Sequence, residues 1–255
     1  MSAPTRPSRR RAPLLVGAAI AATAATLVAA PQAQATLASV STTVDRVHGF
    51  PDWYSDGTTK LKLCVEADFC LGGNNLPDPD LPASLPDNFP DESFYAVARG
   101  ETALNAGGRI RWRAVLEAAF ANEAPINGDQ MTFTRVQVSG DKINSSYFGK
   151  TIRFETPYGD LSATVGTDGT LRRDRRETDP GDAGNGFGAP LLENTTTFGP
   201  TFVQWDTGAP PGFIGNPGVL HTIKGGDRNY FQAFIGTSAV SPRVIRFEVA
   251  GQLAP

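Results

Sequence analysis

Histidine and cysteine are both scarce in this chain, each occurring only twice among 255 residues. Zinc centres and histidine-based catalytic sites need several such side chains in one place, so the composition leaves little room for either. His221 could serve a Ser-His-Asp site, although a structural role near a strand end is the simpler interpretation. The Gly-x-Ser-x-Gly sequence is also absent, and with it the usual signature of an α/β-hydrolase nucleophile.

Long apolar runs are absent except near the N-terminus. There, four arginines between positions 6 and 11 precede an uncharged stretch from Ala12 to Ala30, followed by Ala33-Gln34-Ala35. This order predicts a signal peptide over residues 1–35 that is removed by cleavage after Ala35, with an uncleaved membrane anchor as the alternative. Because the chain ends without an apolar tail, we expect a secreted, extracellular protein with no stable membrane anchor.

Basic residues are few once the signal peptide is removed. The mature chain then has 19 basic and 26 acidic residues, a net charge of −7. Such a surface repels phosphate backbones, so we expect no nucleic-acid partner. In an oxidising compartment the two cysteines, Cys64 and Cys70, are expected to form one disulfide.

Short alternating patterns dominate the mature chain. Residues 60–66, 151–155 and 161–165 alternate polar and apolar side chains, and Ile245, Phe247 and Val249 would share one face of a strand. The 27 glycines and 20 prolines are spread between such runs. This pattern predicts an all-β fold, a two-layer antiparallel β-sandwich of about 10–14 strands, of which a jelly roll is one form. We expect one domain over 36–255, with two smaller sandwiches, 36–140 and 141–255, as the alternative.

One segment fits two patterns. Between Arg109 and Phe120 every even position is apolar, which predicts a strand, but the spacing of its large side chains also suits a helix. We favour the strand, with Asn127-Gly128 in a loop that leads to a returning strand over 131–138. The proline-rich segment 76–90 and the glycine-rich segment 181–188 are expected to be irregular.

Several segments together resemble a family of uncharacterised secreted bacterial β-rich proteins. They read GFPDWYSDG, LCVEADFC, DNFPDESFY, LEAAFAN, GDQMTFTRVQV, TPYG, GFIGNPGVLHTI and NYFQAFIG, and the similarity extends from about Val44 to Leu253. The resemblance implies one structural unit over nearly the whole mature chain. It implies no catalytic residue.

Ligand binding has three candidate segments. Trp53 and Tyr54 lie in an expected loop, where exposed rings could stack on sugars, although Trp53 could instead cover one end of the sandwich. Four arginines could bind an acidic polysaccharide, although a solvated hairpin tip explains them as well. Oxygen-bearing side chains near residue 180 could bind calcium, although turn chemistry also accounts for them. The arginines are Arg172, Arg173, Arg175 and Arg176, and the calcium candidates are Asp179, Asp182 and Asn185.

Paired carboxylates are the remaining catalytic option. Glu117 and Glu155 lie on expected strands, and further candidates are Glu66, Asp129 and Glu248. The sequence favours a secreted non-enzymatic binding or structural protein with an extracellular or cell-wall polysaccharide as its partner and no cofactor, with calcium as the alternative. A glycosidase or lyase using two of these acids is the alternative.

Overall fold

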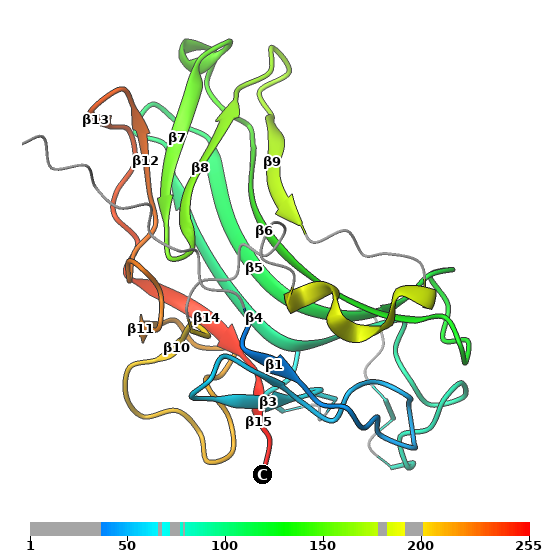
Figure 1. The fold of residues 1–255 in the computed structure, drawn as a ribbon. Coiled ribbons are helices and arrows are strands. Elements are labelled where there is room, and N and C mark those ends of the chain that lie inside the picture. The colour runs from blue at the N-terminus through cyan, green and yellow to red at the C-terminus, as the bar shows by residue number, and fades with distance from the viewer. Residues whose placement is uncertain (1–36, 66–67, 72–76, 79, 178–182, 192–200) are drawn as a thin grey trace, which may run out of the picture. The chain divides into compact units, whose positions relative to one another are not determined.

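The computed structural model describes residues 37–65, 68–71, 77–78, 80–177, 183–191 and 201–255, with the backbone alone at 172–177 and 183–185. These residues belong to one compact unit whose regular secondary structure is almost entirely antiparallel strands (Figure 1). Within the described ranges, no helix has both the length and the apolar character needed to cross a bilayer.

A seven-stranded sheet organises the molecule. Its strand order is β10-β11-β14-β4-β5-β6-β9, and its centre is a meander of three strands of 12 residues each (Figure 1). The strands are β10 (Gln204–Trp205), β11 (His221–Lys224), β14 (Arg246–Ala250), β4 (Glu92–Ala103), β5 (Arg109–Phe120), β6 (Gln130–Asp141) and β9 (Leu171–Glu177).

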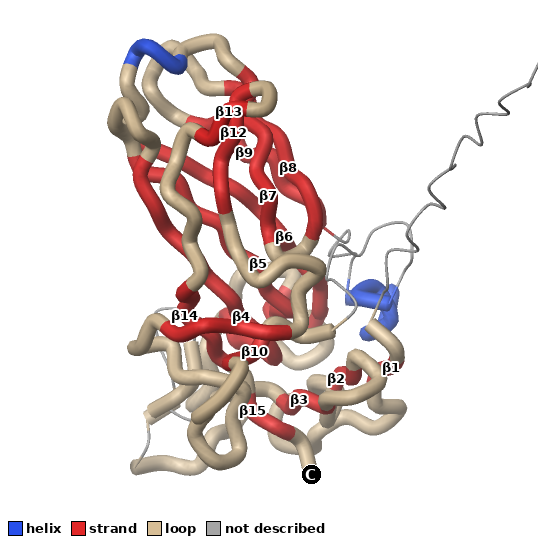
Figure 2. Tube along the Cα trace, turned by 90° about the vertical axis from the view of Figure 1, so that its left-hand side faces the viewer, coloured by secondary structure: helices blue, strands red, loops and turns tan. Residues whose placement is uncertain are grey.

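Two four-stranded sheets form the second layer. One has the order β13-β12-β7-β8 and lies along one end of the long strands, whereas β1-β2-β3-β15 lies near the C-terminus at the other end (Figures 1 and 2). The first contains β13 (Ser238–Ala239), β12 (Gln232–Ile235), β7 (Thr151–Thr156) and β8 (Gly159–Thr164). The second contains β1 (Ser39–Val40), β2 (Tyr54–Ser55), β3 (Lys60–Lys62) and β15 (Gln252–Leu253). Two 3₁₀ segments, η1 (Ser145–Tyr147) and η2 (Ala183–Leu191), complete the described structure.

The even positions of β5 face the core between these layers. Trp112 contacts Tyr158 of the β7–β8 turn with ring centroids 5.9 Å apart, and Phe120 contacts Phe50 at 5.4 Å. One stripe of side chains therefore packs against both small sheets. The segment is a strand, as predicted, because β4 and β6 pair with it along its full length and the apolar stripe has period two. The two-layer antiparallel β-sandwich is likewise confirmed.

Gly100 makes room for the aromatic centre of this core. It lies opposite Trp112 in the β4–β5 register, and the ring of Phe247 packs over it. A Cβ atom at Gly100 would lie 2.7 Å from Cε1 of Phe247, closer than van der Waals contact permits. Phe247 itself meets Trp112 edge-on, with centroids 5.7 Å apart.

Other predicted strands and segments are confirmed only in part. The strands at 151–155 and 161–165 are present as β7 and β8, whereas the pattern at 60–66 gives only the three residues of β3. Ile245 does not share the buried face of Phe247 and Val249: it precedes β14 and is 52% exposed. Of the glycine-rich segment, the described part contains two short 3₁₀ turns within Ala183–Leu191, separated by a kink at Gly186, whose backbone is not helical. β6 runs continuously through residue 140, the boundary of the two-sandwich alternative, and β14 pairs with β4 across that boundary.

The disulfide forms as predicted. The Sγ atoms of Cys64 and Cys70 are 2.03 Å apart. Cys64 also donates its backbone N–H to the carbonyl of Phe94 in β4, 3.0 Å away. The bridge therefore closes a short loop that pairs with the backbone of β4 at Phe94. Leu71, just after the bridge, packs on the outer face of the seven-stranded sheet, the face that points away from the core.

Candidate functional site

Trp53 and Tyr54 point in opposite directions because successive side chains alternate at the start of β2. Trp53 is half-buried at the surface, whereas Tyr54 has no exposed area. The prediction that both rings could stack on a ligand is therefore wrong for Tyr54.

Tyr54 is a core residue with its polar end satisfied. Its hydroxyl lies 2.5 Å from Thr132 Oγ1 and donates to the Phe187 carbonyl at 2.7 Å, and its ring meets Tyr95 edge-on at 4.8 Å. Burial raises the pKa of the Tyr54 hydroxyl well above its usual range. The Tyr54 side chain connects the β1-β2-β3-β15 sheet to β6 and η2 and does not face a ligand.

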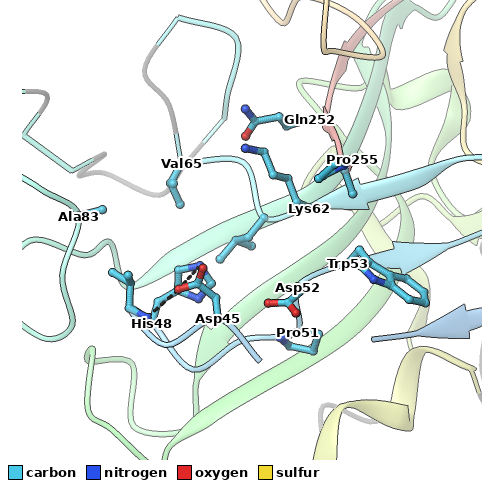
Figure 3. Close-up of a pocket in the computed structure, with 13 residues that line it drawn as sticks. Asp45, His48, Pro51, Asp52, Trp53, Lys62, Val65, Ala83, Gln252 and Pro255 are labelled. Carbon is cyan, nitrogen blue, oxygen red and sulfur yellow. Dashed lines mark hydrogen bonds and ion pairs between the residues drawn. The ribbon is translucent and has the colours of Figure 1, made fainter. Parts of the chain in front are cut away.

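Trp53 lines a surface cavity of about 580 Å³, here called the Trp53 pocket. Figure 3 shows that its walls come from separate segments: the loop between β1 and β2, the end of β3, the chain before β4, and β15 with the C-terminus. The polar groups on these walls differ in charge. They are Asp45, His48, Asp52, Lys62 and Gln252.

The loop that supplies three of these groups is held by its own hydrogen bonds. Asp45 Oδ1 accepts from the backbone N–H of Val47 at 2.7 Å, and the backbone N–H of Asp45 donates to the Phe50 carbonyl at 2.9 Å. At the far side of the loop, Asp52 accepts a short hydrogen bond from the Thr43 hydroxyl. Asp45 and Asp52 are thus positioned by local turn chemistry before any ligand binds.

His48 is a neutral component of the pocket wall. Its Nδ1 accepts from the Phe50 backbone N–H at 3.2 Å, so the neutral ring carries its proton on Nε2, which lies 3.7 Å from Asp45 Oδ1. The ring packs against Phe89 with centroids 5.2 Å apart. Burial lowers the His48 pKa, and this effect outweighs the opposing charges of Asp45 and Asp52.

Trp53 is held by a cation outside the pocket. Nζ of Lys60 lies 4.4 Å from the centre of the Trp53 ring, and Lys60 is not among the residues that line the cavity. The cation and the pocket therefore contact different parts of the indole. An apolar ring beside two carboxylates and the Lys62 ammonium can contact the C–H face of a ligand while its hydroxyl groups are hydrogen-bonded.

The arginine cluster lies in a strand rather than at a hairpin tip. Residues 171–177 form β9, the edge strand of the seven-stranded sheet, and the turn that was expected among the arginines precedes them. In the backbone register Arg175 pairs with Gln137 and Arg176 with Val136. Side chains of this strand, including Arg172 and Arg173, lie outside the described part of the structure.

The calcium candidates also fall mostly outside the described residues. Asp179 and Asp182 are not described, and Asn185 is described only as backbone in η2. Among described residues, no group of three or more metal-ligating side chains is present.

The four candidate carboxylates within the described residues lie on different elements of the fold. Glu117 lies on the outer face of β5, Glu155 lies on β7 and accepts from the Tyr230 hydroxyl at 2.6 Å, and Asp129 in the β5–β6 turn accepts from Asn122. Glu248 lies on β14, and Glu66 is outside the described residues.

Glu117 instead has a neighbour that sequence reasoning missed, Glu92. Glu92 lies near it across the β4–β5 pairing, and burial, followed by the effect of the Glu92 carboxyl group, raises the pKa of Glu117 to about 9. Arg135 lies 3.5 Å from Glu117 Oε2, but burial outweighs its opposing effect. Glu117 is therefore protonated at neutral pH. No sequence spacing signals the pair, because a β-bulge in β4 sets its register.

His221 begins β11, consistent with a place at a strand end. Its ring stacks on Trp205 with centroids 4.4 Å apart, and its Nδ1 lies 3.3 Å from Asp206 Oδ1. Asp206 has a lowered pKa, first because Thr222 hydrogen-bonds to it. The Trp205–His221 stack packs one edge of the seven-stranded sheet.

No protein-family model, curated protein or solved structure matches this chain.

Proposed function

We propose that this is a secreted, non-enzymatic carbohydrate-binding protein whose site is the Trp53 pocket. The observation that carries the proposal is a half-buried indole in an open cavity of about 580 Å³ that also holds Asp45, Asp52 and Lys62. The cavity has the size of a small-molecule site, about 300–1,000 Å³. Aromatic contact combined with a few fixed polar groups suits the alternating C–H and hydroxyl surfaces of a sugar.

Retention on insoluble polysaccharides tests the proposal. Mature protein is incubated with peptidoglycan, chitin, cellulose and xylan, and the bound fraction is measured against protein concentration. Trp53→Ala should weaken retention at least tenfold, equivalent to about 1.4 kcal/mol of binding free energy, with an unchanged melting temperature. Trp53→Phe should retain part of the binding because it keeps an aromatic ring.

The matched control is Ile245→Ala, which removes an exposed apolar side chain outside the Trp53 pocket. It should bind as the unsubstituted protein does. If Trp53→Ala and Ile245→Ala are retained equally on a polysaccharide that the unsubstituted protein binds, Trp53 is not part of the site.

A second candidate function is polysaccharide hydrolysis, which is favoured by the presence of two carboxylates, Asp45 and Asp52, in the same pocket. Release of reducing ends from the same polysaccharides measures it. Hydrolysis that is abolished by Asp52→Asn would replace the binding proposal. Release at the rate of a buffer blank would exclude hydrolysis of these substrates.

A further inference from the structure

A second cavity opens on the outer face of the seven-stranded sheet, and we call it the outer-face pocket. It measures about 560 Å³, and none of its described lining residues belongs to the Trp53 pocket. The pairing of four strands brings its lining residues together. Glu248 of β14, Arg99 of β4, Arg113 of β5 and Gln137 of β6 are successive partners across four strands. Their side chains face away from the core because the alternate residue, Trp112, faces into it.

This row of side chains has a net positive charge, because Arg99 and Arg113 outnumber its one carboxylate, Glu248. Arg99 and Arg113 lie directly opposite each other, an arrangement of like charges that destabilises a sheet. Among described residues, no carboxylate oxygen lies within 4.0 Å of the nitrogen atoms of either guanidinium. The neighbouring Arg111 differs: it is paired with Glu101 at 2.9 Å and with Asp141 at 2.8 Å.

Two buried polar atoms at this pocket also have no hydrogen-bond partner among the described residues. They are Nε of Arg113, a donor, and Oε1 of Gln137, an acceptor. Buried polar atoms without a partner destabilise the fold. The Arg113 guanidinium is held in place over the Phe94 ring, 5.2 Å from its centre. Burial and the charge of Arg99 lower the Arg113 pKa, as expected when two cations are forced together.

A ligand that satisfies this pocket needs both an oxyanion and hydroxyl donors. An oxyanion would satisfy Arg99 and the free Nε of Arg113, and hydroxyl groups would donate to Gln137 Oε1 and to the carboxylate of Glu248. The exposed Leu220 at the rim offers an apolar contact. A single inorganic anion supplies the oxyanion but no hydroxyl donor, and it fills little of the cavity.

We propose that the outer-face pocket binds an acidic sugar, with the carboxylate of a uronic acid residue held between Arg99 and Arg113 and a sugar hydroxyl donating to Gln137. This site is additional to the Trp53 pocket and does not depend on it. It would give the protein a charge-dependent contact with acidic polysaccharide on a face separate from the aromatic site.

Isothermal titration calorimetry with the mature protein tests this proposal, using galacturonic acid trimer, the corresponding neutral galactose trimer, and inorganic sulfate as probes. The acidic trimer should bind at least tenfold more tightly than the neutral trimer or sulfate. Its binding should weaken at high salt. Sulfate binding as tightly as the acidic trimer would overturn the assignment to a sugar. Absence of binding by the acidic trimer would overturn the site itself.

Variants locate the site. Arg99→Gln and Gln137→Leu should each weaken binding of the acidic trimer at least fivefold. The matched control is Arg246→Gln, which removes the same charge from an exposed position on β14 outside the pocket. Trp53→Ala should leave this binding unchanged. Equal loss in Arg99→Gln and Arg246→Gln would show that net charge alone attracts the ligand and would refute a built site.

Discussion

Replacement of Glu117 by glutamine should remove much of the pH dependence of stability above neutral pH. The residue is 2% exposed, and burial together with the nearby Glu92 carboxyl group raises its pKa to about 9 in the folded protein. In the unfolded chain the pKa returns to about 4.5. Between these values the folded state keeps a proton that the unfolded state releases, so the free energy of unfolding falls as the pH rises.

The size of this pH dependence follows from the one proton that Glu117 holds in the folded state and releases in the unfolded state. Stability changes by about 1.4 kcal/mol per pH unit for each proton held only by the folded state. Between pH 7 and pH 8.5 the unsubstituted protein should therefore lose about 2 kcal/mol because of Glu117. His48 contributes little in this window, because its pKa is lowered in the fold and its imidazole is largely neutral in the unfolded chain above pH 7. Glu117→Gln keeps the shape and the neutral charge of the protonated group.

Urea unfolding monitored by tryptophan fluorescence at pH 7.0 and 8.5 measures this effect. The control is Glu155→Gln. The pKa of Glu155 is lowered, chiefly by the Tyr230 hydrogen bond, so its contribution is complete above about pH 5 and is lost only as the pH falls further. This variant should be less stable at both pH values but should keep the slope of the unsubstituted protein. An unchanged slope in Glu117→Gln would mean that Glu117 is ionised in the fold.

Two further predictions concern the fold itself. Serine substitution of both Cys64 and Cys70 should lower the free energy of unfolding by about 2 kcal/mol, the chain-entropy value for so short a loop, and an unchanged urea midpoint would contradict this. Gly100→Ala should cost about 1–3 kcal/mol because the new methyl group meets the Phe247 ring, whereas Gly128→Ala adds a methyl group that meets no atom within 4 Å. Gly128 has a positive φ of 100°, so its substitution reports backbone strain alone. If thermal melting finds the Gly100→Ala variant as stable as the unsubstituted protein, the packing argument is refuted.

The local alternation of polar and apolar residues predicted many of the strands. The alternation at 109–120 and at 151–165 favoured strands, because a period of two in apolar side chains suits a strand with one buried face. At 109–120 the spacing suited a helix as well, and the pairing of β5 with β4 and β6 makes this segment a strand. Trp53 and Tyr54, in contrast, were expected together in a loop, and the sequence alone did not show that their side chains alternate there or which of the two faces the core. That choice depends on Thr132, Phe187 and Tyr95, which are distant in sequence and supply the partners that bury Tyr54.

The candidate sites depend on long-range pairing to a greater extent. Glu117 resembled a catalytic acid in the sequence, and only the pairing of β4 with β5 brings Glu92 beside it and makes it a buried, neutral group. Arg99 and Arg113 are isolated arginines in the sequence, and they form one row only because the register of four strands sets them side by side.

The sequence by itself therefore determined the strand-rich fold and the pairing of the only two cysteines, because alternation and a short loop are local properties. The tertiary structure alone decided which charged and aromatic side chains share a pocket. Cross-strand register joins residues that no spacing along the chain relates, and burial then sets their charge.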